Sequence, residues 1–139
     1  MTSKHRSPGD ERNRTIERID HIALVVTSVE TSVAWYLEMF GFESFGTSPG
    51  SRVTYVGNSS IRLAMLEASD ESPFIPPVNQ GARACHFAFR TNGAGYVGYQ
   101  NKLDREGISY DKLTHIDSQS IYFSDPDGYV IEVTTYDDV

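Results

Sequence analysis

Two blocks of the chain share one order of apolar and polar positions. The first begins at Ile19 with IDHIALVV, which is short, apolar and rich in β-branched residues and therefore predicts a buried strand. Apolar residues at helical spacing follow and stop at Gly41, which predicts a helix over 29–40 capped by Ser28 or Thr27. Three further strands are predicted at 42–47, 52–56 and 61–66.

The same order returns after a long, proline-containing connection at 67–81. The pattern predicts a strand, a helix closed by Gly107 and three more strands, at 84–90, 94–105, 109–113, 119–124 and 129–136. The spacing also repeats, because 20 residues separate His21 from Gly41 and 21 separate His86 from Gly107. We therefore predict an α+β fold of two βαβββ modules, about 19–66 and 84–136, that form a curved mixed sheet with the helices outside.

Length, charge and cysteine content limit the number of domains, the binding partners and the cell compartment. The 139 residues suit one domain, predicted at 16–139 after a flexible polar tail at 1–15. Twelve Lys and Arg against 19 Asp and Glu give a net charge of −7, which opposes binding to nucleic acid and to anionic membranes. With one cysteine, no secretory signal and no run of apolar residues long enough to span a bilayer, the sequence predicts a cytoplasmic protein.

Three polar residues interrupt strands that are otherwise apolar. His21 and His86 occupy matching positions in the two modules, and Glu132 breaks the last predicted strand. Each alone could be structural, as a hydrogen-bonded histidine or a charge at a sheet edge. Together they suit a divalent metal, because two imidazoles and a carboxylate form the facial triad used for Fe(II), with positions left for water, substrate or dioxygen. A metal would also explain why a carboxylate is placed where it would otherwise be costly to bury.

The segments IDHIALVVTSVETSVAWYLEMFGFE, CHFAF and IYFSDPDGYVIEV resemble the vicinal oxygen chelate superfamily, which includes glyoxalase I, fosfomycin-resistance proteins, bleomycin-binding proteins and extradiol dioxygenases. The resemblance covers about 16–136. It implies paired βαβββ modules, and a metal bound by His21, His86 and Glu132. Fe(II) is the first choice, with Mn(II), Zn(II) or Ni(II) as alternatives. The resemblance also implies a small-molecule substrate and a homodimer, because members of this superfamily close their sheets between chains.

Within the superfamily, the spacing from His115 through Ile121-Tyr122 and DPDG to Glu132 resembles the signature of extradiol dioxygenases, although Leu113 departs from it. This resemblance implies cleavage of a catechol-like substrate with Fe(II) and dioxygen. His115 would then exchange a proton with the substrate, and Tyr122 would stabilise developing charge. Both could instead be structural, as a loop histidine and a packed strand aromatic.

Alternative chemistries depend on what accompanies the three ligands. Glyoxalases and epimerases generally add a ligand from the last strand of the first module; alignment places Arg62 there, and neither it nor Ala64 can coordinate a metal. Arg62 could pair with a substrate carboxylate or lie on the surface. Phe74 could close over a substrate or cover the sheet edge.

Two other members of the superfamily remain as alternatives. Fosfomycin-resistance proteins share the resemblance to SIYF and DP-x-G but usually follow the last glutamate with Leu-His, where this chain has Val133-Thr134. Bleomycin-type binding proteins lack the metal ligands that this chain retains. The sequence thus favours a dioxygenase and keeps an epoxide-opening enzyme and a sequestering protein as alternatives.

Overall fold

The computed structural model describes residues 14–77 and 86–139. The chain runs through two βαβββ modules in sequence, as predicted. The elements are β1 (Ile22–Val26), α1 (Val29–Phe40), β2 (Glu43–Thr47), β3 (Val53–Gly57), β4 (Arg62–Glu67), β5 (His86–Arg90), α2 (Gly93–Glu106), β6 (Asp111–Thr114), β7 (Gln119–Ser124) and β8 (Val130–Thr135). The predicted tail falls largely on residues outside the described ranges, so the proposed domain boundaries stay a prediction.

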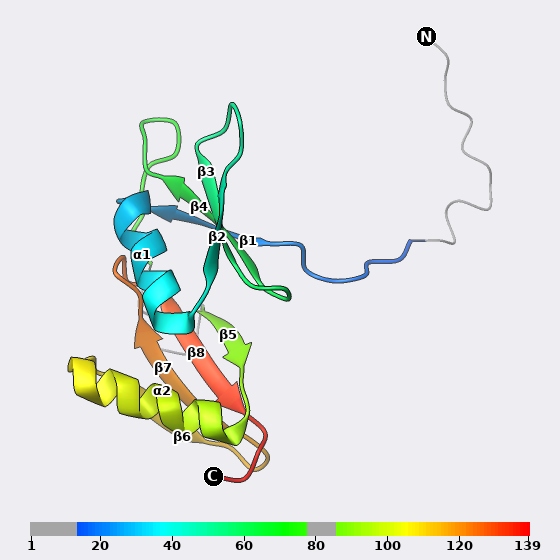
Figure 1. Cartoon of the computed structure of the whole chain (residues 1–139), viewed down its shortest axis with the longest axis vertical. Coiled ribbons are helices and arrows are strands. Elements are labelled where there is room, and N and C mark those ends of the chain that lie inside the picture. Colours follow the sequence, from blue (N-terminus) through cyan, green and yellow to red (C-terminus); the bar gives the residue numbers. More distant parts are fainter. Residues whose placement is uncertain (1–13, 78–85) are drawn as a thin grey trace.

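Each module has its own four-stranded mixed sheet. The strand orders are β1-β4-β3-β2 and β5-β8-β7-β6, with the first two strands of each sheet parallel and the others antiparallel. The α+β fold of two βαβββ modules is therefore confirmed, with two separate sheets where the pattern suggested one curved sheet. β1, which follows His21, and β5, which begins at His86, are both edge strands in the described structure (Figure 1).

Local sequence explains where both helices begin and end. The Ser28 side chain caps α1 by accepting the backbone N–H of Thr31, and Asn92 caps α2 in the same way. Gly41 and Gly107 end the helices in the left-handed conformation, which glycine adopts without steric cost. In the described part of the chain, neither helix is long and apolar enough to cross a membrane.

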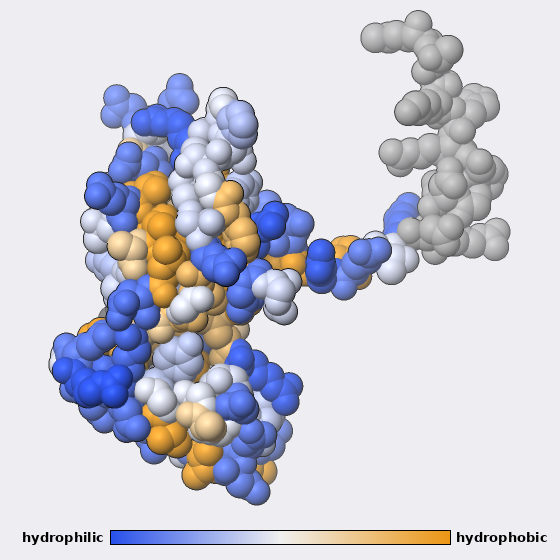
Figure 2. Space-filling view, viewed as in Figure 1, coloured by the Kyte–Doolittle hydropathy of each residue, from blue (hydrophilic) through white to orange (hydrophobic). Residues whose placement is uncertain are grey.

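One apolar core joins the two modules. α1 packs on the first sheet, and its aromatic residues also reach the second, where Phe40 lies 5.0 Å from Phe89 and Trp35 lies 6.2 Å from Phe123, ring centre to ring centre. Figure 2 shows hydrophobic residues gathered where α1 lies in Figure 1, with polar residues around them. Because the aromatic contacts bridge both sheets, burial of apolar surface holds the modules together.

The turn between β7 and β8 adds a polar lock between the modules. Buried Asp125 accepts a hydrogen bond from the Tyr36 hydroxyl of α1 at 2.7 Å. Asp127 accepts bonds from the backbone and hydroxyl of Thr27 at 3.1 and 2.6 Å. The Tyr129 hydroxyl donates to a carbonyl of β1 at 2.6 Å. These contacts fix the first module against the second, so the modules cannot turn toward each other without breaking them.

Candidate metal centre

His86 and Glu132 face each other on the second sheet. His86 begins β5, and Glu132 lies in β8 opposite Ala88, so both side chains project from the same face. The Nε2 atom of His86 lies 2.9 Å from Oε1 of Glu132, and the two side chains are 22% and 13% exposed. The strand alternation thus brings two predicted metal ligands together in a partly sheltered position.

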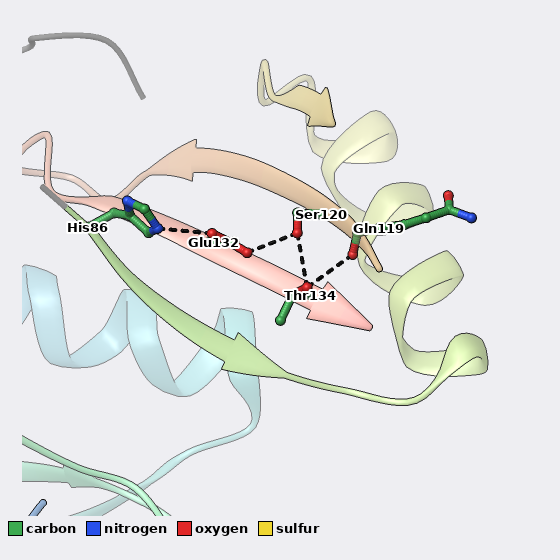
Figure 3. Close-up of polar contacts among 5 residues, drawn as sticks. All are labelled: His86, Gln119, Ser120, Glu132 and Thr134. Carbon is green, nitrogen blue, oxygen red and sulfur yellow. Dashed lines mark hydrogen bonds and ion pairs between the residues drawn. The ribbon is translucent and has the colours of Figure 1, made fainter. Parts of the chain in front are cut away.

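A hydrogen-bond network supports the second carboxylate oxygen (Figure 3). The Ser120 hydroxyl of β7 lies 2.8 Å from Oε2 of Glu132 and 2.9 Å from Oγ1 of Thr134. The Thr134 hydroxyl in turn donates to the Gln119 carbonyl at 3.2 Å. Glu132 therefore has one oxygen held by the sheet and the other turned to His86.

Tyr122 completes this group, which we call the His86 cluster (His86, Tyr122 and Glu132). It pairs with Glu132 across β7 and β8 and is only 7% exposed. Its ring meets that of His86 edge-on, with 5.4 Å between centroids. The predicted site residue Tyr122 therefore lies beside two of the three predicted ligands, His86 and Glu132.

His21 belongs to a second group, the His21 cluster (His21, Tyr55 and Arg62). The rings of His21 and Tyr55 meet edge-on at 6.2 Å, and the Arg62 guanidinium lies 5.7 Å from the centre of the Tyr55 ring and 5.2 Å from that of Phe45. Nδ1 of His21 lies 2.7 Å from an oxygen of Asp20, and this bond is the main cause that lowers the pKa of that carboxyl group. The His21 side chain is 41% exposed.

Strand register shows that the two clusters are counterparts and corrects the sequence alignment. Tyr55 pairs with Ala64 in the first module as Tyr122 pairs with Glu132 in the second. The position that matches Glu132 is therefore Ala64, and the prediction that it is Arg62 was wrong by two residues. The first module still supplies no carboxylate there, so the inference that a fourth ligand is missing from this position is unchanged.

The three predicted ligands do not meet within one chain. Among residues 14–77 and 86–139, no three His, Cys, Asp or Glu side chains form a group that could hold a metal. The structure thus brings together His86 and Glu132 and leaves His21 in the other module. The expectation that one chain gathers all three on one concave sheet does not hold.

The other two predicted site residues lie farther out. His115 lies in the exposed turn before β7. Tyr122 lies within β7, three residues or about 10 Å of strand after the first residue of that strand, so the turn is far along the sheet from Tyr122. The ring of Phe74 packs edge-on against Tyr129 at 6.3 Å. Tyr129 immediately precedes the β8 residue that pairs with His86, so Phe74 lies near the His86 end of the sheet.

The His86 cluster supplies two donors that suit a divalent metal, His86 and Glu132. Two ligands about 2.1 Å from one ion and at right angles are about 3 Å apart, which matches the 2.9 Å between the His86 nitrogen and the Glu132 oxygen. Imidazole and carboxylate together suit metals such as Mn(II), Fe(II) and Zn(II). Ser120 supplies the outer support that such ligands usually have.

Sequence reasoning missed Tyr55 of the His21 cluster and Ser120, the hydrogen-bond partner of Glu132. Ser120 lies two residues before Tyr122 on a strand, so alternation placed it on the same face as Glu132. Tyr55 could have been found by matching the first module's third strand to that of the second.

Comparisons with known proteins agree with this fold. The profile of the Glyoxalase/Bleomycin resistance protein/Dioxygenase superfamily matches residues 18–133. Virulence protein STM3117 of Salmonella typhimurium is 26% identical over 129 residues, covering 87% of this chain and 85% of its own. Glutathione transferase FosA of Serratia marcescens is 24% identical over 118 residues, covering 85% and 80%.

A solved structure of similar fold was determined in complex with a metal. A glutamate-to-glutamine mutant of the fosfomycin resistance protein FosX from Listeria monocytogenes, complexed with Mn(II) and 1S,2S-dihydroxypropylphosphonic acid, has a TM-score of 0.65 and 20% identity. The match covers 86% of this chain and 90% of that one. None of these three relatives is a dioxygenase by name, so the comparisons leave the extradiol subtype without support. The two-module fold and the matching profile place this chain in the Glyoxalase/Bleomycin resistance protein/Dioxygenase superfamily.

Proposed function

We propose that this protein is a metal-dependent enzyme of the fosfomycin-resistance type, which opens an epoxide or similar electrophile on a small anionic substrate. The observation that carries the proposal is the His86–Glu132 pair, held 2.9 Å apart with Tyr122 against it. The named relatives FosA and FosX favour this chemistry over ring cleavage by dioxygen. The exposed turn position of His115 gives no support to the proton transfer that a dioxygenase would assign to it.

We further propose that two copies of the chain build each site. His21 immediately precedes β1, and His86 is the first residue of β5. Both strands are edge strands whose outer edges are unpaired in the described structure. The lock around Asp125 and Asp127 opposes closure within one chain. A twofold homodimer that joins β1 of one copy to β5 of the other would place His21 of the partner subunit beside His86 and Glu132.

The side chains have separate roles in this mechanism. A divalent metal, when bound, supplies a Lewis acid that polarises the substrate oxygen. Glu132 and His86 provide its negative and neutral donors from two adjacent strands. A thiol or water attacks a ring carbon and gives up its proton, the ring C–O bond breaks, and the released oxygen takes up one proton, so that overall the nucleophile's proton ends on that oxygen. Tyr122, buried beside the pair, stabilises the charge that develops on that oxygen.

The direct test is turnover by the full-length protein loaded with Mn(II), using fosfomycin as the epoxide and either glutathione or water as the nucleophile. We expect an adduct or a diol with the wild type and loss of product with Glu132→Gln, which retains the shape of the side chain but removes the charged ligand. A panel of catechols tested with Fe(II) in an oxygen electrode is the matched alternative. Oxygen uptake there, with no epoxide opening, would overturn the proposal in favour of the dioxygenase.

Arg62 is proposed to hold the anionic part of the substrate, because its guanidinium lies over the Tyr55 ring that also contacts His21. Removal of a charged hydrogen bond costs about 1.5–3 kcal/mol. We therefore expect Arg62→Gln to raise KM for an anionic epoxide about tenfold or more while kcat changes little. Steady-state kinetics with a neutral epoxide is the control, since its KM should not respond to the substitution.

A further inference from the structure

We infer that Ser120 is a positioning residue that fixes Glu132 as a ligand through one oxygen. This inference rests on the proposed metal site and concerns a residue outside the ligand set. Ser120 is fully buried and lies on β7 between two paired strands, so its hydroxyl has a fixed position. That hydroxyl is 2.8 Å from Oε2 of Glu132, the oxygen that does not face His86 (Figure 3).

Thr134 offers the serine proton a second acceptor. The Ser120 oxygen has two partners within hydrogen-bonding distance, Glu132 and the Thr134 hydroxyl at 2.9 Å. Because an ionised carboxylate is the stronger acceptor, the serine proton is donated to Glu132. The Thr134 hydroxyl donates its own proton to the Gln119 carbonyl at 3.2 Å, so its oxygen is an acceptor that competes with Glu132 for the serine proton.

This arrangement has a consequence for the metal. With Oε2 engaged by Ser120, Glu132 presents only Oε1 beside the His86 nitrogen. A carboxylate that binds through one oxygen uses one coordination position and leaves more of them for substrate. A freely rotating carboxylate could bind through both oxygens or swing away from the histidine.

The test measures Mn(II) affinity of the full-length protein by calorimetry, without substrate. We expect Ser120→Ala to weaken Mn(II) binding about 10- to 100-fold, the range seen when outer-shell partners of metal ligands are removed. Thr134→Val removes the competing acceptor and leaves the serine proton to Glu132, so Mn(II) affinity should stay at the wild-type level or rise. Ser32→Ala is the matched control, because Ser32 is another buried serine beside a carboxylate, Asp127, in the lock between modules.

Each outcome decides between the metal site and the role of the serine. Weaker binding in Ser120→Ala with unchanged binding in Ser32→Ala supports the inference. Wild-type affinity in Ser120→Ala overturns it while leaving the metal site intact. If Ser120→Ala does not fold, Thr134→Val decides, since weaker Mn(II) binding there overturns the inference and unchanged or tighter binding supports it. A wild-type protein that binds no Mn(II) would instead overturn the metal site on which the inference rests.

Discussion

Mixing two inactive variants of this protein is expected to restore activity. His21→Ala and Glu132→Gln each remove a proposed ligand, so each homodimer alone should lack turnover. If the site combines His21 of one copy with His86 and Glu132 of the other, a mixed dimer has one complete site and one that lacks both ligands. Random pairing makes half of the dimers mixed, so about a quarter of wild-type activity should return after co-refolding.

The matched control pairs His86→Ala with Glu132→Gln. These two ligands come from one chain, 2.9 Å apart, so a mixed dimer of these variants contains no complete site. We expect no recovery from this mixture, measured by the same turnover assay. Equal recovery from both mixtures, or none from the first, would contradict a site shared between copies. Sedimentation analysis of each sample would show that the variants still form dimers.

The secondary structure could be predicted from sequence because its signals are local. The first helix begins and ends at the predicted residues, 29 and 40, because Ser28 caps its start and Gly41 ends it in the left-handed conformation. Strand ends differ from the prediction by up to three residues, the largest difference being at β1, which begins at Ile22 and not at Ile19. The three residues before Ile22 continue the predicted strand in the sequence but have no partner strand in the described structure.

The alignment of the two modules failed for a different reason. Arg62 was matched to Glu132, whereas the register places Ala64 there. Side chains alternate along a strand with a period of two, so a shift of two residues keeps every side chain on the same face and leaves the apolar pattern unchanged. The strand pairing reveals the true correspondence, since Tyr55 pairs with Ala64 as Tyr122 pairs with Glu132, and such pairing is a tertiary property.

Convergence of the ligands was also beyond sequence pattern. The matching positions of His21 and His86 correctly indicated equivalent places in two modules, each beside an aromatic residue. Whether equivalent places meet depends on how the modules pack, which is decided by contacts far apart in sequence such as Tyr36 with Asp125. The pattern therefore predicted which residues occupy equivalent positions without predicting that one chain keeps them apart.

Asp125 is expected to be the most sensitive single position for stability. Its carboxylate accepts the Tyr36 hydroxyl at 2.7 Å and the backbone N–H groups of Asp127 and Tyr129, each at 2.9 Å. Asp125→Ala would leave these donors without their acceptor, at about 1–3 kcal/mol for each donor that remains buried. We expect the free energy of unfolding to fall by about 3 kcal/mol or more in urea denaturation, with Tyr36→Phe costing about 1 kcal/mol.

Asp125→Asn separates hydrogen bonding from charge at the same position. An amide keeps an oxygen for the two backbone donors, so Asn should lose much less stability than Ala. Burial raises the pKa of Asp125 above 3.8, opposed by the bond from Tyr36. A carboxyl group with a raised native pKa stabilises the fold fully below 3.8, and that contribution is lost as pH rises through the native value. Wild-type stability should therefore improve relative to Asp125→Asn as pH falls through this window, and a constant difference would show that burial of the charge costs nothing.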